Sequence, residues 1–407
     1  MSAAGQLLYS WSRVDRQRLS GIRLEEDIRD ALQCVRTTAP SIEQRRKLLE
    51  LSDQVGVQYA FLGFPATSSQ EAELCLDLAL HAARQSLTIE PVFMARAVST
   101  DVEAIVELQV AAARTVTADI FIGISSLRLA VEGWTLSDAL GKLARACTVA
   151  ASHGVQFRVS LEDSSRAKPE HVACAVRAAS DLGATGIILC DTTGDCLPDG
   201  AARHTAFTVD ELAKTGAKVD IGWHGHNDKG LGLANALAAA CAGADIISGT
   251  FLGIGERTGN IPLEQMIILL AEAGNERHNL LVLTQLCQTL AASVAVDIPA
   301  GAPIVGADAF STSTGTHAAA ILKAKSFGIE YEDLIYSAVQ ATSLGRSQQL
   351  LIGANSGRKA INAALLECGL APNEAQVEAL LRHCKQRRTC LQGRDDILRA
   401  LDGLGRE

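Results

Sequence analysis

The strongest constraint on the fold of this 407-residue chain is a regular alternation of two kinds of segment. Short apolar runs rich in β-branched residues occupy positions 57–64, 87–94, 118–125, 155–161, 186–192, 219–226 and 244–252. Amphipathic segments of helix length lie between them, for example at positions 41–55, 69–83, 136–153, 169–182 and 230–242. Strand and helix patterns that alternate in this way are typical of parallel βαβ units.

An eighth strand is needed to close such a sheet into a barrel, and we assign it to residues 21–30. The acidic residues Glu25, Glu26 and Asp27 in this segment are atypical of a strand. Eight units in about 250 residues predict an α/β fold, the (β/α)8 TIM barrel. A doubly wound open sheet is the alternative, but no Gly-x-Gly-x-x-Gly motif follows the first strand.

The alternation stops near residue 274, and this change sets the domain organisation. We assign residues 1–20 to an N-terminal segment, 21–274 to a catalytic TIM barrel, and 275–407 to a linker and a small, mostly helical C-terminal subdomain. The linker is indicated by Pro-Ala-Gly-Ala-Pro at positions 299–303. Helices are predicted at positions 279–296, 359–368, 373–384 and 395–401.

Composition narrows the classes of partner and compartment. The net charge is −9 and no basic block is present, so nucleic acid is not an expected partner. No apolar segment reaches transmembrane length, and the first residues lack the pattern of a signal peptide, so we expect no membrane association. The eleven cysteines are scattered without a Cys-x-x-Cys motif, which favours free thiols in a reducing cytoplasm.

Polar residues gather where the predicted strands end, the edge at which TIM barrels carry their active sites. They are Arg29-Asp30, Arg96, Ser125-Ser126, Glu162-Asp163, Asp191-Thr192-Thr193, the residues from His224 to Asp228, and the residues from Gly253 to Arg257. Any single one of them is equally explained as a helix cap or loop residue. Their recurrence at seven strand ends predicts an active site there.

His224 and His226 are the most informative of these residues. In a strand, residues two apart face the same way, so both imidazoles would point together at the end of an apolar strand. Two imidazoles at this spacing can bind one divalent metal. The alternative is a polar strand end with two hydrogen-bonded histidines.

At these positions the chain resembles the DRE-TIM metallolyase family, and within it the acetyl-CoA-dependent 2-isopropylmalate and homocitrate synthases. The resemblance rests on His-Gly-His-Asn-Asp-Lys-Gly at 224–230, Gly-Thr-Phe-Leu-Gly-Ile-Gly-Glu-Arg-Thr-Gly-Asn at 249–260 and Ile-Arg-Asp-Ala-Leu-Gln at 28–33. Residues 162–166 and 191–194 match two further motifs of the family. The similarity extends over residues 20–365.

The resemblance implies a metal-dependent Claisen condensation of acetyl-CoA, the co-substrate, with a 2-oxo acid. Asp30, His224 and His226 would bind a divalent metal (Zn, Mn or Mg), with Asn260 near or in the ligand set. The metal would polarise the ketone of the 2-oxo acid. The enzyme would then be an acyltransferase that converts the acyl group into an alkyl group on transfer.

Further roles follow from the same resemblance. Four residues are implied in catalysis: Arg29, which would place positive charge beside the developing oxyanion, and Glu162, His317 and Tyr336, which would assist removal of the acetyl proton. Four are implied in substrate binding: Gln33, Arg96, Arg128 and Thr192. Three are implied in acetyl-CoA binding: Gly253, Gly255 and Glu256. Because His317 and Tyr336 lie outside the barrel, we expect a homodimer whose C-terminal region reaches the partner barrel.

The chain also departs from the family pattern on the substrate side. Ala31 replaces a glycine, and Leu32 and Phe61 stand where relatives carry polar residues. Arg128 resembles the homocitrate synthase arginine that meets the distal carboxylate of the substrate, which favours a 2-oxo acid with a second acidic group. A pair with Glu132 and an alkyl or aryl substrate is the alternative. Two other functions stay open: a lyase or aldolase that does not use acetyl-CoA, and a catalytically inactive homologue.

Overall fold

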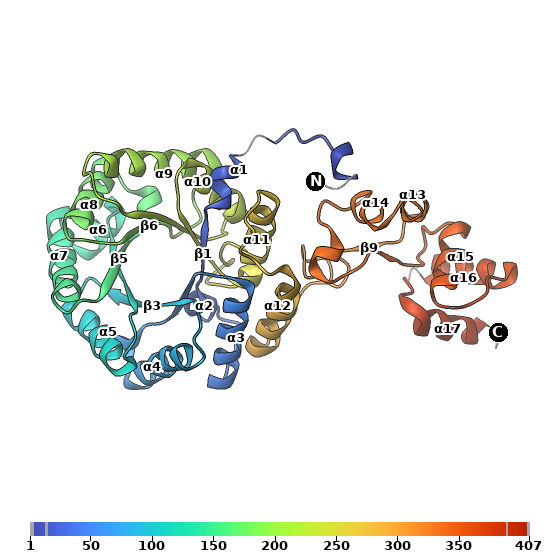
Figure 1. Ribbon diagram of the computed structural model, residues 1–407, viewed down its shortest axis with the longest axis horizontal. Coiled ribbons are helices and arrows are strands. Elements are labelled where there is room, and N and C mark those ends of the chain that lie inside the picture. The colour runs from blue at the N-terminus through green and yellow to red at the C-terminus, as the bar shows by residue number, and fades with distance from the viewer. Residues whose placement is uncertain (1–3, 13–14, 388–389, 405–407) are drawn as a thin grey trace. The chain divides into compact units, whose positions relative to one another are not determined.

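The computed structural model describes residues 4–12, 15–387 and 390–404. The chain forms two compact units (Figure 1). One runs from Val14 to Asp297 and contains the barrel; the other combines Met1–Arg13 with Ile298–Glu407. Each unit is described by itself.

Eight parallel strands close into a barrel in the first unit, which confirms the predicted TIM fold. Each strand pairs with the next along the chain, and β1 pairs with β8 to complete the ring, visible on the left of Figure 1. The strands are β1 (Arg23–Glu26), β2 (Tyr59–Gly63), β3 (Glu90–Arg96), β4 (Thr117–Gly123), β5 (Gln156–Glu162), β6 (Gly186–Asp191), β7 (Asp220–Gly225) and β8 (Ile246–Gly249).

The longer helices of this unit cover the outer faces of the barrel strands, and shorter helices, such as α2, lie at the strand ends (Figure 1). They are α1 (Arg16–Ser20), α2 (Ile28–Ala31), α3 (Ile42–Val55), α4 (Ser69–Arg84), α5 (Ser99–Ala112), α6 (Ser126–Glu132), α7 (Leu136–Ser152), α8 (Pro169–Asp181), α9 (Pro198–Ala213), α10 (Gly232–Ala242), α11 (Leu263–Glu272) and α12 (Leu280–Val294). Local sequence explains their ends. Helix α3 begins with a capping box between Ser41 and Gln44 and ends at Gly56, whose φ of 90° suits glycine.

The first strand is shorter than we predicted, and this corrects the position of two site residues. Strand β1 ends at Glu26, and the chain then turns into the short helix α2. The side chain of Asp27 caps this helix by accepting a hydrogen bond from the Asp30 backbone N–H at 2.9 Å. Arg29 and Asp30 therefore lie on a helical turn above the strand and not within it.

The interior of the barrel is unusually polar below the strand ends. Arg158 on β5 is buried and donates to Asp119 on β4 at 2.5 Å and to Glu25 on β1. Its Cζ atom also lies 5.7 Å from the centre of the Phe61 ring on β2. The acidic run that made residues 21–30 an atypical strand is thus accommodated, because Glu25 meets a cation from the opposite wall.

The second unit is built from short helices with a small apolar core of its own. Its helices are α13 (Gly315–Lys325), α14 (Ile329–Leu334), α15 (Arg358–Glu367), α16 (Glu374–Arg387) and α17 (Gly393–Leu404), and a short parallel pair joins β9 (Ser311–Thr312) to β10 (Gln349–Leu350). Ile361, Leu365, Leu380 and Ile397 are central to its core. Across the described residues of both units, no helix is long and apolar enough to cross a membrane.

Candidate active site

A cavity of about 390 Å³ opens among the carboxyl ends of the barrel strands, and all eight strands line it. The lining includes eight of the residues singled out from the sequence: Arg29, Asp30, Gln33, Glu162, Thr192, His224, His226 and Glu256. The remaining residues singled out as site residues lie elsewhere, as described below.

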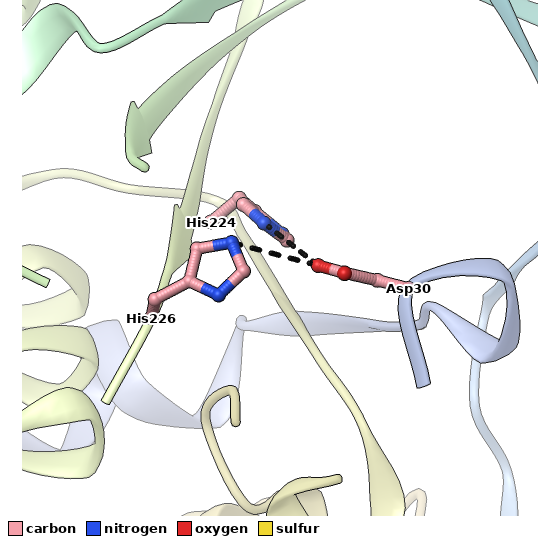
Figure 2. A group of neighbouring side chains, drawn as sticks. All are labelled: Asp30, His224 and His226. Carbon is pink, nitrogen blue, oxygen red and sulfur yellow. Dashed lines mark ion pairs between the residues drawn. The ribbon is translucent and has the colours of Figure 1, made fainter. Parts of the chain in front are cut away.

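Asp30, His224 and His226 form the centre of this cavity. One ligand atom from each residue lies within 4.8 Å of the others. The Nε2 atoms of His224 and His226 lie 3.4 Å and 3.6 Å from the same carboxylate oxygen of Asp30. Figure 2 shows both rings turned toward that oxygen, with the histidines on the β7 side and Asp30 on the α2 turn.

The charges in this group are strongly coupled. Burial alone would raise the pKa of Asp30, but the hydrogen bond from His224 and the nearby charge of Arg29 outweigh it and lower that pKa. Burial favours neutral His224, yet the hydrogen bond to Asp30 reverses this and raises the pKa of His224. Burial, followed by repulsion from His224, lowers the pKa of His226 to about 4. An ionised carboxylate beside a neutral imidazole is the protonation state that a metal ligand needs.

Two buried polar atoms beside this group are unsatisfied among the described residues. They are Nδ1 of His226 and the side-chain oxygen Oδ1 of Asn260. The backbones of these two residues form an isolated antiparallel bridge, so Asn260 lies next to His226. His224 is oriented from its other side, where Nδ1 lies 3.3 Å from the hydroxyl of Ser248. The donor set therefore fits a divalent metal, since it offers one carboxylate, two imidazoles and an amide oxygen that has no other partner. The hydroxyl of Ser248 would hold the His224 ring in the orientation that a ligand needs.

Arg29 lies beside the metal ligands and is held from two sides. It donates to Asp27 at 2.6 Å, and its Cζ lies 4.8 Å from the centre of the Phe61 ring. Its Nε is buried with no hydrogen-bond partner among the described residues. The guanidinium therefore keeps a donor that a substrate oxygen could use.

Thr192 follows β6 at the cavity wall, and its hydroxyl accepts a hydrogen bond from the Asp163 backbone N–H at 2.8 Å. Because the oxygen is used as an acceptor there, the hydroxyl hydrogen is free to point at a substrate anion. Asp163 adopts a left-handed backbone conformation, with φ 57°, which brings its N–H to this position.

Glu162 ends β5 and carries a carboxylate at the cavity wall. Burial raises the pKa of Glu162, and the positive charge of Arg128, whose Nε lies 3.5 Å away, partly opposes this. Arg128 also pairs with Glu132 one helical turn later on α6, at 2.9 Å. Arg128 does not line the cavity, and the partner weighed from the sequence, Glu132, is the one it meets.

Arg96 likewise stands outside the lining. It forms a two-pronged pair with Asp101, at 2.8 Å and 2.9 Å, and its side chain is 57% exposed. Asp101 is five residues further on, at the first turn of α5. The role predicted for Arg96 in substrate binding remains a prediction.

The three residues implied in acetyl-CoA binding divide between two hollows. Glu256 lines the main cavity, whereas Gly253 and Gly255 line a neighbouring hollow of about 600 Å³ with Arg36 and Asp297. Gly259 meets Gly253 so closely that a Cβ atom would overlap the Gly253 carbonyl oxygen, and its φ is 94°. The glycines of this loop therefore allow a compact turn after β8.

One residue that links three loops of the site was placed at a strand end from the sequence but was given no role of its own. Arg257 donates to Asp228 at 2.9 Å and to the Thr192 carbonyl oxygen at 2.7 Å, so it joins the loops after β6, β7 and β8. The inward-facing Ser160 and Phe121 were also missed. Strand alternation could have found them, since Ser160 lies two residues before Glu162.

His317 and Tyr336 belong to the second unit. Their rings stack with centroids 4.1 Å apart and an interplanar angle of 25°, and both side chains are exposed. His317 lies on α13, and Tyr336 follows α14. The two residues paired by the resemblance are thus neighbours, while their role stays a prediction.

The chain belongs to the HMGL-like family, whose sequence profile matches residues 22–294. A second profile, described as a homocitrate synthase post-HMGL domain, matches residues 304–389. These matches cover the barrel and much of the second unit, and they confirm the family recognised from the motifs.

Relatives at about 30% identity carry two kinds of name. The homocitrate synthase AksA of Methanopyrus kandleri is 32% identical over 346 residues, which are 84% of this chain and 82% of that protein. A 2-isopropylmalate synthase from Solidesulfovibrio magneticus is also 32% identical, over 84% of this chain and 66% of its own length. An HMG-CoA lyase structure shares the fold, with a TM-score of 0.58 and 21% identity over 72% of this chain and 95% of its own.

Proposed function

We propose that this protein catalyses a metal-dependent Claisen condensation of acetyl-CoA with a 2-oxo acid, as the homocitrate and alkylmalate synthases do. The observation that carries the proposal is the group of Asp30, His224 and His226, whose ligand atoms lie within 4.8 Å in a cavity at the strand ends. The names of the relatives support the same reaction class. They do not distinguish one 2-oxo acid from another.

Asp30, His224 and His226 are the residues that would bind the metal, and the side-chain oxygen of Asn260, which is buried with no hydrogen-bond partner among the described residues, would complete the set. When bound, a divalent metal supplies Lewis-acid polarisation of the substrate ketone. Ser248 fixes the His224 ring from behind. Zn, Mn and Mg each accept such a mixed carboxylate and imidazole set.

The surrounding residues bind and orient the 2-oxo acid. Thr192 donates its free hydroxyl hydrogen to the substrate carboxylate. Arg29 places a guanidinium beside the ketone oxygen, where negative charge develops as the new carbon–carbon bond forms. Its position is set by Asp27 and by the face of the Phe61 ring, so little reorganisation is needed during the reaction.

Glu162 is the proposed base for the acetyl group. It accepts a proton from the methyl carbon of acetyl-CoA, and that carbon then bonds to the ketone carbon of the 2-oxo acid. Partial burial raises the pKa of Glu162, which makes the carboxylate a stronger base. The ketone oxygen gains a proton to become a hydroxyl, and water then cleaves the thioester to release CoA.

The decisive assay follows CoA release with a thiol-reactive dye. Full-length protein loaded in turn with Zn²⁺, Mn²⁺ or Mg²⁺ is given acetyl-CoA and a panel of 2-oxo acids. The protein carries eleven free cysteines, which also react with the dye, so a blank without acetyl-CoA is subtracted. We expect release that requires both a 2-oxo acid and a metal, and that Asp30→Asn abolishes but the exposed-site control Asp199→Asn does not.

Three results would count against the condensation. Release of CoA that is independent of any 2-oxo acid would indicate a thioester hydrolase. Cleavage of a hydroxy acid without acetyl-CoA would indicate the lyase or aldolase alternative. No turnover across the panel, with metal bound and the fold intact, would favour an inactive homologue.

We also propose a homodimer in which the C-terminal region of each subunit reaches the barrel mouth of its partner. The stacked, exposed rings of His317 and Tyr336 support a role for the second unit in removing the acetyl proton. Mixing inactive Arg29→Ala protein with inactive His317→Ala protein should restore activity, because a hybrid dimer contains one intact site. Absence of rescue, with subunit exchange demonstrated by mass spectrometry of the mixture, would refute this arrangement.

The compartment we propose is the reducing cytoplasm. The eleven cysteines are free thiols, and the buried ones, such as Cys75 and Cys287, pack as small apolar residues. Acetyl-CoA and a small 2-oxo acid are then the partners, besides a second copy of the chain.

A further inference from the structure

We propose that the site takes a 2-oxo acid whose side chain is uncharged and apolar, a branched alkyl or aryl group, and that it excludes acids with a second carboxylate. This rests on the condensation proposed above and names its substrate class. It also reverses the preference that Arg128 suggested in the sequence.

The cavity is already rich in negative charge. Six carboxylate side chains line it: Glu25, Asp27, Asp30, Asp119, Glu162 and Glu256. Among the described lining residues, Arg29 is the one guanidinium or ammonium side chain, and it pairs with Asp27 at 2.6 Å. The first carboxylate of a 2-oxo acid has the metal and Thr192 as partners, whereas a second would meet carboxylates.

Arg158 contacts two of these lining carboxylates, and its Nη1 is buried with no hydrogen-bond partner among the described residues. It is 3% exposed and pairs with both Glu25 and Asp119, each 1% exposed. The second oxygen of Asp119 is buried with no hydrogen-bond partner among the described residues. A substrate anion placed there would meet one guanidinium already shared by two carboxylates, and the unpaired oxygen of Asp119 would repel it in a buried setting, where like charges interact strongly.

Arg128 offers no better anchor for a second acid. Its Nη1 lies 2.9 Å from Glu132 and its Nε 3.5 Å from Glu162, and the side chain stands outside the cavity lining. A substrate anion would have to displace both carboxylates. Because one of these is the proposed base, such displacement would also disturb the removal of the acetyl proton.

The side chains of β2, β3, β4 and β6 that line the cavity are mostly apolar, with Asp119 on β4 as the charged exception. Phe61, Met94, Phe121 and Ile188 project into the cavity from these four adjacent or nearby strands, and Phe61 and Ile188 are buried. Each further methylene that a substrate buries here is worth about a factor of four in affinity. An isopropyl group should therefore be preferred over the methyl group of pyruvate by roughly tenfold.

The test measures kcat/KM for CoA release with metal-loaded, full-length protein and matched acids. The apolar acids are 2-oxoisovalerate, 4-methyl-2-oxopentanoate and phenylpyruvate; the dicarboxylic acids are 2-oxoglutarate and oxaloacetate. The second carboxylate of a dicarboxylic acid would be buried without a partner. The cost of such a charge predicts that kcat/KM for the best apolar acid exceeds that for either dicarboxylic acid by at least about 30-fold. Faster turnover of either dicarboxylic acid would overturn the proposal.

Substitutions locate the preference in the apolar wall. Phe121→Ala should raise the ratio of phenylpyruvate to 2-oxoisovalerate turnover at least fivefold, because it opens space beside the wall. Met94→Arg should bring 2-oxoglutarate turnover closer to that of 2-oxoisovalerate by adding a cation. The exposed Phe327→Ala serves as the matched control and should change neither ratio. Arg128→Ala should also leave the apolar-to-dicarboxylic ratio unchanged, whereas a selective loss of dicarboxylic turnover would assign the anchor to Arg128 and refute us.

Binding of the acids alone separates this inference from the condensation on which it rests. Calorimetry with metal-loaded protein and no acetyl-CoA measures recognition without chemistry. Tighter binding of apolar acids without CoA release would sustain the substrate class and overturn the condensation. CoA release that is fastest with a dicarboxylic acid would support the condensation and overturn the substrate class. If the protein neither binds nor turns over any of the acids, both proposals are overturned.

Discussion

Replacing Arg158 with methionine is the most direct test of the ion cluster beneath the site. Methionine keeps most of the unbranched chain but removes the charge that Glu25 and Asp119 share. All three side chains are almost fully buried, with exposures of 3%, 1% and 1%. Breaking a buried pair by removing one partner costs about 3–5 kcal/mol, because the remaining charge is left uncompensated.

This loss should depend on pH in a defined direction. Burial raises the pKa of Glu25, and the charge of Arg158 opposes that rise. Without Arg158 the pKa of Glu25 rises further above its unfolded value, so folding binds a proton. The stability of the variant is then fully present below the unfolded pKa and is lost as pH rises through the folded pKa. The difference from the native protein should be larger at pH 8 than at pH 5.

Urea unfolding followed by the fluorescence of the buried Trp223 measures this free energy. A loss of 3–5 kcal/mol corresponds to a fall in melting temperature of roughly 6–20 °C. The matched control is Arg203→Met, since Arg203 pairs with Asp199 where their side chains are 80% and 67% exposed; it should cost less than about 1 kcal/mol. Adding Glu25→Gln and Asp119→Asn to Arg158→Met should recover at least half of the loss. A loss below about 1 kcal/mol, or one equal at both pH values, would refute the reasoning.

Three further outcomes follow from the site. His224→Ala and His226→Ala should each abolish turnover and lower the amount of metal that stays bound after dialysis, as measured by elemental analysis. Circular dichroism and the melting temperature should stay close to those of the native protein. Full activity of chelator-treated His226→Ala protein would refute the metal assignment. Ser248→Ala should weaken metal affinity about 10- to 100-fold by freeing the His224 ring, and unchanged affinity would mean that the 3.3 Å contact does not orient it. Arg128→Ala should move the acidic limb of the kcat/KM profile to higher pH, because loss of the cation raises the pKa of Glu162 further; a shift to lower pH would contradict Glu162 as the base.

The fold was predictable because its signal is local and repeated. Seven strands appear in the sequence as apolar runs, and the amphipathic segments between them fall on helices of the ring. The first strand was difficult because its acidic residues are compensated at long range: Glu25 meets Arg158, 133 positions later in the chain. The sequence near residue 25 does not reveal this partner, so the first strand could be assigned only because a closed barrel needs eight strands.

Some residues of the candidate site could be predicted from local sequence patterns, and others could not. His224 and His226 could be paired from strand alternation, and Asp30 was reached only through the resemblance to a family. Arg96 and Arg128 show the opposite case, in which local carboxylates decide. Asp101 and Glu132 lie five and four residues further on and take both guanidinium groups. For Arg128 that spacing on a helix is a known ion-pair arrangement, and it could have been weighted more heavily from the sequence.

The charge distribution links the proposed metal to the proposed substrate. Six carboxylates and one guanidinium line the cavity, so its electrostatic potential favours the binding of a divalent cation and disfavours a substrate with two negative charges. A divalent cation held by Asp30 and the two histidines would offset part of this charge, and under the proposed function one substrate carboxylate would bind near Thr192. Two of the other carboxylates, Glu25 and Asp119, pair with Arg158, whose Cζ lies 5.7 Å from the centre of the Phe61 ring. Under the substrate class proposed above, an apolar side chain would pack against that ring, whereas a second carboxylate would meet the negative charge beside it. We therefore expect Phe61 to be one of the residues at which the choice of substrate is made.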